Sequence, residues 1–328
     1  MTFRCFGHNR SSESGPDGRV AVRQGLALSL CLLATLPAGT ARAQGAGAVP
    51  MPPGQTVPRA PDALTAPPPA FQAVTADRIA QVLRIDPLAE VLATEISAAG
   101  DPTGTTGDPA SDRGWPPIVA RIVPVTRLRD GLRDGLAASV AGLDDPLSRA
   151  AVADALGFWA SPLGQRTVAL EHSARLALTD PEAKAAARAA FDAAAARDDP
   201  RIGQIRRLID AADLVEPAVA ASMNIAVASA QGLRDSGLFH ATDADLAEDG
   251  WVQEPELRAE QAGWIESLLF LATGTLSDAE VERLIQFSAT PGARRLNRMV
   301  DAAATAVFVS VARDLGNAAG LRQAGQPL

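Results

Sequence analysis

Cysteine is scarce in this chain of 328 residues, which contains only Cys5 and Cys31. Both lie in an N-terminal segment that the sequence predicts to be removed, so the remaining chain carries no thiol. This absence excludes disulfide bonds and cysteine nucleophiles, even in a compartment where disulfides could form. The fold must therefore be stabilised by packing alone.

Histidine is also scarce, since only His172 and His240 follow the N-terminal segment. Helical bundles that hold two metals between carboxylates need Glu-x-x-His on two helices, but Ala169 and Gly237 stand three residues before these histidines. The patterns His-Glu-x-x-His and Gly-x-Ser-x-Gly are absent, as is a glycine-rich phosphate loop. We predict no catalytic residues, no metal site and no cofactor.

Signals for β-strands are lacking too, because the sequence has no stretches of alternating apolar residues and no runs rich in β-branched residues. Apolar residues instead recur at helical spacing, as in Leu128, Leu132, Leu136 and Val140, on a helix predicted to end near Gly142. The sequence therefore predicts an all-α multi-helix bundle.

Long apolar runs are missing except near the N-terminus, where Arg19 and Arg23 precede the run Gly25–Leu36. Twelve apolar residues are too few for a bilayer span, which needs about 20. Small residues then lead to Ala43, so we predict a signal peptide over 1–43 that is cleaved near Ala43. An uncleaved anchor is the second interpretation. We expect the mature protein in the periplasm, with no stable membrane span.

Acidic residues exceed basic ones, giving the whole chain a formal charge of −8. Removing the signal takes away five arginines and two acids, which leaves 25 basic and 36 acidic residues and a charge of −11. This charge argues against nucleic acid and anionic lipid as main partners. It fits an exported protein.

The chain divides by composition. Eight prolines among small residues predict a disordered linker over 44–71. Apolar residues at helical spacing then predict a first helical half over 72–198 and a second over 199–320, followed by a disordered tail over 321–328.

A helix, turn, helix stretch in the first half recurs in the second. Ser161 is suited to cap a helix, Pro162 to its first turn, and Gly164 to a close approach of two helices. The same order of residue types returns at an offset of 129 (287 − 158). The matching positions are Phe158 and Phe287, Ser161 and Thr290, and Pro162 and Pro291. This internal repeat predicts two tandem related halves.

The pattern Phe158-x-x-Ser161-Pro162-x-Gly164-Gln165-Arg166 resembles the family catalogued as domain of unknown function 2059. The stretch 251–260 resembles the exported long members of that family from alphaproteobacteria. The resemblance covers about residues 75–320 and implies an exported helical protein. It brings no activity and no catalytic residues to carry over.

Proline and glycine clusters predict where the helices break. We expect a break at Pro87, a loop over 100–114, and separate helices on the two sides of a break between Gln253 and Pro255. The last helix is predicted to end at Leu315.

The most function-like cluster consists of Trp251, Glu254, Glu256 and Glu260. One interpretation is a solvated acidic face over a buried aromatic, and the other is a surface that binds a partner. Glu254 and Arg258 stand four residues apart and can form an ion pair.

Glu171 and Arg175 have the same spacing, and we expect them to form a surface ion pair. Together these observations favour a binding module of the cell envelope that has no catalytic activity and binds another envelope protein or itself. Two alternatives stay open. One is a hydrolase or lyase that uses carboxylates alone, with Glu171 or the Glu254 to Glu266 cluster as acid or base. The other is a carrier of an apolar ligand.

Overall fold

The protein is an all-α multi-helix bundle, as the sequence predicts. The structure, a computed structural model, describes residues 74–103 and 109–326, and these form helices and connecting turns without a strand. The predicted signal peptide and linker lie outside the described residues. The helices are α1 (Ala76–Val82), α2 (Ile85–Ala98), α3 (Pro109–Ile122), α4 (Val125–Ala141), α5 (Pro146–Trp159), α6 (Pro162–Ala177), α7 (Pro181–Ala195), α8 (Pro200–Ala212), α9 (Val215–Asp235), α10 (Asp243–Thr273), α11 (Asp278–Ser288) and α12 (Pro291–Gln323).

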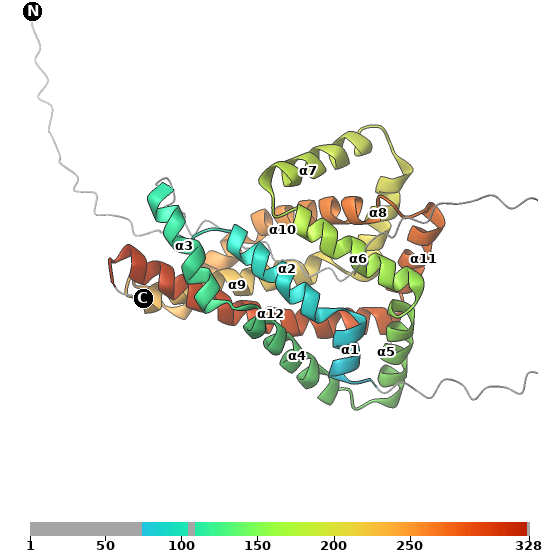
Figure 1. The fold of residues 1–328 in the computed structure, drawn as a ribbon, viewed down its shortest axis with the longest axis horizontal. Helices are drawn as coiled ribbons and strands as arrows, with labels where there is room; N and C mark the ends of the chain where they lie inside the picture. The colour runs from blue at the N-terminus through green and yellow to red at the C-terminus, as the bar shows by residue number, and fades with distance from the viewer. Residues whose placement is uncertain (1–73, 104–108, 327–328) are drawn as a thin grey trace, which may run out of the picture.

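Helix α12 is the long central element of the bundle. It packs along α9 and α4 and also contacts α3, α5 and α8 (Figure 1). Helix α10 packs against α6, α7, α8 and α9. The buried apolar side chains of all these helices join in one continuous cluster, so residues from both predicted halves share a single core. The predicted stripe of α4 is part of it, since Leu128, Leu132 and Leu136 are buried.

Most helices begin at a capping side chain followed by proline or an acid, as the sequence predicts at Ser161 and Pro162. Ser161 accepts a hydrogen bond from the backbone N–H of Gly164, and Thr290 accepts one from Ala293. Asp180 and Asp199 cap α7 and α8 in the same way. A capped N-terminus satisfies N–H groups that have no partner inside the helix.

Helices end or continue differently from the prediction at several prolines. The break between α1 and α2 lies at Arg84, whose φ of 53° is left-handed, and Pro87 stands in the first turn of α2. Proline is tolerated there because its missing N–H has no helical partner in any case. Helix α10 runs unbroken through Pro255, and α3 starts at Pro109 inside the predicted loop.

The C-terminal helix is also longer than predicted. Helix α12 continues past Leu315 to Gln323, so the start of the predicted tail is helical. Leu315, Ala318 and Ala319 are buried against the bundle, and tertiary packing of this kind decides where a helix ends. Residues 327–328 lie outside the described residues.

The two stretches for which the sequence predicts a repeat form helix corners that pack against each other. Phe158 and Phe287 stack with ring centroids 3.7 Å apart and an interplanar angle of 9°. The corners also leave no room for side chains at their glycines. A Cβ on Gly164 would lie 2.4 Å from the carbonyl oxygen of Phe158, and one on Gly292 would lie 2.1 Å from that of Ala151.

Two bends between consecutive helices have the same backbone conformation. The left-handed residues Arg84 and Asp213 join α1 to α2 and α8 to α9, and they are related by the same offset of 129 (213 − 84). No single helix of the described residues has the length and apolar character to cross a bilayer. Helices α8 and α9, which meet at an angle of 66°, satisfy that criterion only when taken together.

Candidate interaction surface

Trp251 is the exposed tryptophan of the chain. Its side chain is 69% exposed on α10, whereas Trp115, Trp159 and Trp264 are at most 9% exposed. Val252 lies beside it and is 74% exposed. Large apolar side chains lose favourable free energy when they stay in water, by about 1.5 to 3 kcal/mol each. Two adjacent exposed side chains of this kind form a small apolar patch on the surface of α10.

The N-terminal half of α10 holds these two side chains outward. A capping box begins the helix, because Thr242 and Asp245 each accept a hydrogen bond from the backbone N–H of the other. Leu246 and Leu257 point into the core. Helical spacing then turns Trp251 to solvent. Pro255 has no N–H, so the carbonyl of Trp251 loses its usual helical partner.

Acidic side chains surround the exposed pair. Glu248, Asp249 and Glu256 lie one helical turn from Trp251 or Val252, and all three are exposed. They make no ion pair among the described residues. We call Trp251, Val252, Glu248, Asp249 and Glu256 the Trp251 face.

The structure separates the four residues that the sequence grouped together. Trp251 and Glu256 belong to the Trp251 face. Glu254 lies at its edge, where it accepts a hydrogen bond of 2.7 Å from Nε of Arg258. Glu260 is half-buried, and this burial raises its pKa against the opposing effect of Lys184 on α7. Helical spacing places its side chain on nearly the opposite side of α10 from the side chain of Trp251.

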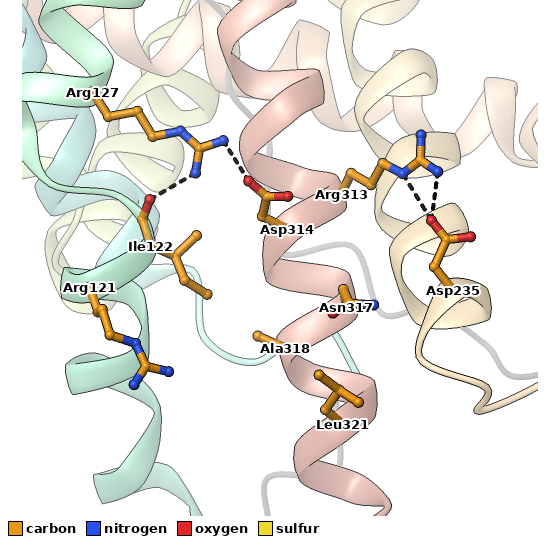
Figure 2. A pocket seen from close by; sticks show the side chains of 9 residues that line it. All are labelled: Arg121, Ile122, Arg127, Asp235, Arg313, Asp314, Asn317, Ala318 and Leu321. Atoms are coloured by element: carbon orange, nitrogen blue, oxygen red, sulfur yellow. Dashed lines mark hydrogen bonds and ion pairs between the residues drawn. The ribbon is translucent and has the colours of Figure 1, made fainter. Parts of the chain in front are cut away.

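A groove lies over the C-terminal part of α12, with α3 and α4 on one side and α9 on the other (Figure 2). Its cavity volume is about 610 Å³. The lining residues are Arg121, Ile122, Arg127, Asp235, Arg313, Asp314, Asn317, Ala318 and Leu321. No local pattern in the sequence indicates this groove, because the consecutive helices α3 and α4 meet α9 and α12 there, which lie far from them in the chain.

Two of the three arginines in the groove are held by acids of the protein itself. Arg127 donates to Asp314 at 2.6 Å, and Arg313 donates to Asp235 at 2.6 and 2.9 Å. Arg121 is exposed at the C-terminal end of α3 and makes no hydrogen bond or ion pair with any described residue (Figure 2). The groove therefore carries one guanidinium that has no partner in the described part of the chain, next to the apolar side chains of Ile122 and Leu321.

A charged network is buried elsewhere, between α2, α6, α10 and α12. The side chain of Arg175 is 0% exposed and donates to Glu171 at 3.4 Å and to Glu95 at 3.2 Å. Its guanidinium lies over the ring of Trp264, 4.8 Å from the centroid. The predicted pair of Glu171 and Arg175 exists, but its predicted surface position is wrong. Helical spacing fixes the pairing and says nothing about burial.

Burial sets the ionisation of this network. It raises the pKa of Glu171 well above its usual value, because desolvation outweighs the nearby Arg175. It also raises the pKa of Glu95, and it raises the pKa of Asp301 on α12 to about 7. Desolvation lowers the pKa of His172 to about 4, so this histidine is neutral at pH 7.

In the described ranges 74–103 and 109–326, no three histidine, aspartate or glutamate side chains are placed to hold a metal ion. Comparison with known proteins identified no matching family model, no matching curated protein and no matching solved structure.

Proposed function

We propose that this protein is a binding module of the cell envelope without catalytic activity, and that it binds another protein through the Trp251 face. The single observation that carries the proposal is the exposure of Trp251 beside Val252, in a chain that buries its other described tryptophans. Tryptophan is among the residues that contribute most to protein interfaces, because it buries a large rigid surface at a small entropic cost.

The charges of the Trp251 face indicate the chemistry of its partner. Glu248, Asp249 and Glu256 carry negative charge around an apolar centre. A complementary surface has an apolar depression with arginine or lysine at its rim, and arginine can also stack on the indole ring. The predicted signal peptide and linker fit such a module, because the signal would export the bundle and the linker would remain as a flexible N-terminal segment.

The proposal includes two related halves that share the core. Phe158 and Phe287 pack on each other, the left-handed breaks at Arg84 and Asp213 recur at the same spacing, and the order of helices is compatible. In that correspondence α10 takes the place of α3 and α4, and α12 takes the place of α6 and α7. The resemblance to domain of unknown function 2059 is part of the same proposal.

Site-specific photocrosslinking tests the binding function. A photoreactive amino acid replaces Val252 in the exported protein, and the matched control carries it at Leu147, which is 81% exposed on α5. We expect a discrete crosslinked protein product from position 252 and none from position 147. The absence of a product from position 252, or the same products from both positions, would contradict the proposal.

A carboxylate-dependent hydrolase or lyase is the second candidate, and one observation favours it. Asp301 is half-buried, and burial raises its pKa to about 7, which suits a general acid or base at neutral pH. Glu171 is less suited, because its side chain is 1% exposed and cannot meet a substrate without opening of the bundle. Activity on a panel of esters and glycosides that disappears in Asp301→Asn would support this candidate.

The groove is lined mainly by charged side chains and does not support a carrier of apolar ligands.

A further inference from the structure

The groove and the Trp251 face carry unmatched charges of opposite sign. In the groove, the Arg121 guanidinium has no partner within residues 74–103 and 109–326. On the Trp251 face, the carboxylates of Glu248, Asp249 and Glu256 have no cation of the described chain to pair with. A charge left without a partner at the surface is available to a second molecule, and opposite charges also guide two surfaces into register.

Their apolar parts match as well. Ile122, Ala318 and Leu321 form the apolar lining of the groove. On the other surface, the exposed side chains of Trp251 and Val252 project outward from α10 and could enter such a groove. A cavity volume of about 610 Å³ is in the range of pockets that enclose drug-sized ligands, so it can take one indole side chain and its neighbours.

The two surfaces also occupy corresponding positions of the repeated sequence. Ile122 corresponds to Trp251, and Arg127 to Glu256, at the offset of 129 (251 − 122) that relates the two motif copies. One stretch thus presents basic side chains around a groove, whereas the corresponding stretch presents acidic side chains around a tryptophan.

We propose that the partner of the Trp251 face is a second copy of this chain, which receives Trp251 in its groove and pairs Arg121 with the acids of the face. This inference rests on the proposed function and names the partner. Each copy carries both surfaces, so binding is between two different patches, as in a heterologous interface. The mature chain carries a net charge of −11, and copies repel each other elsewhere, which makes the basic groove the favoured contact.

Sedimentation velocity tests the proposal on the whole chain as it is purified after export. Arg121→Glu disables the groove and leaves the Trp251 face intact. Trp251→Ser disables the face and leaves the groove intact. The matched controls are Arg129→Glu, an exposed arginine of α4, and Leu147→Ser, an exposed leucine of α5. Circular dichroism confirms that each variant is folded.

We expect the wild type and both controls to associate as concentration rises through the micromolar range. Each of the two test variants should associate at least about tenfold more weakly, which corresponds to about 1.4 kcal/mol. An equal mixture of Arg121→Glu and Trp251→Ser should recover a one-to-one pair, because the intact face of the first variant meets the intact groove of the second. This recovery depends on direct contact between the two surfaces.

Three results would overturn the inference: a wild type that stays monomeric, test variants that associate as strongly as the controls, or a mixture that recovers no pair. Its failure is distinguishable from failure of the proposed function. If position 252 crosslinks to a different protein and the purified chain stays monomeric, the Trp251 face is a binding site and the partner is not a second copy.

Discussion

Phe158 and Phe287 stack face to face, with their ring centroids 3.7 Å apart, although they lie far from each other in the sequence. Their positions are related by 129 residues (287 − 158), the offset of the predicted repeat. Trp159 packs edge-on against both rings, at 5.6 and 5.3 Å. The two helix corners are therefore joined by direct aromatic contact within one core.

A double-mutant cycle measures this contact. Phe158→Ala and Phe287→Ala should each destabilise the protein by about 2 to 4 kcal/mol through lost burial. We expect a coupling energy of about 0.5 to 1.5 kcal/mol between them, measured by urea unfolding. The control cycle pairs Phe158 with Phe191, whose ring packs on Phe270 instead. Additive effects in the first cycle would contradict the stacking.

Gly292 should not tolerate a methyl group. Gly292→Ala places a Cβ 2.1 Å from the carbonyl oxygen of Ala151, so α12 and α5 must separate. We expect a loss of about 1 to 3 kcal/mol in the free energy of unfolding. The matched control is Gly157→Ala, because a Cβ there meets nothing within 4 Å. That control should gain about 0.5 to 1 kcal/mol from higher helix propensity, and equal effects of the two substitutions would contradict the packing.

Arg175 should be essential for stability. Arg175→Met leaves Glu95 and Glu171 buried without their cation, so we expect a loss of about 3 to 5 kcal/mol in chemical unfolding. Adding Glu171→Gln to that variant should recover part of the loss, since it removes one buried acid. The exposed pair of Arg129 and Asp130 provides the control, and Arg129→Met should change stability by less than about 1 kcal/mol. Comparable losses in the two variants would be evidence against the buried network.

The pH dependence of stability should change in Asp301→Asn. The pKa of Asp301 is raised to about 7 in the folded protein, so the folded state binds its proton more tightly than the unfolded state. Between pH 4 and pH 7 this group therefore lowers stability as pH rises, by at most about 4 kcal/mol. Removing the charge should stabilise the protein at pH 8 and change little at pH 4.

His172 has the opposite effect, because its lowered pKa means that stability falls as the pH drops from 6.5 to about 4. Thermal unfolding of the wild type and Asp301→Asn at both pH values separates the two contributions. Asp134→Asn, at an exposed site on α4, is the control and should behave as the wild type does. If the difference in stability between Asp301→Asn and the wild type were the same at both pH values, this would contradict the raised pKa of Asp301.

Local sequence signals predict the helices well and tertiary relationships poorly. Ser161 with Pro162, and Thr290 at the matching position, mark helix starts correctly, because capping depends on nearby backbone groups. Pro255 does not end a helix, because the packing of α10 on its neighbours outweighs the cost of one lost hydrogen bond.

The candidate site shows the same limit. Trp251 and Glu256 could be singled out from composition and spacing along one helix. The burial of Arg175 and the groove beside Arg121 could not be, since each depends on helices from distant parts of the chain.

Thiol labelling at position 252 tests the binding role of the Trp251 face most directly. The mature chain lacks cysteine if the signal is cleaved as predicted, so Val252→Cys or Leu147→Cys introduces a single thiol. Maleimide should label both positions at similar rates in the dilute purified protein, because both are exposed. In intact cells, we expect position 252 to be labelled at least about tenfold more slowly than position 147. Equal labelling of the two positions in cells would contradict a bound Trp251 face.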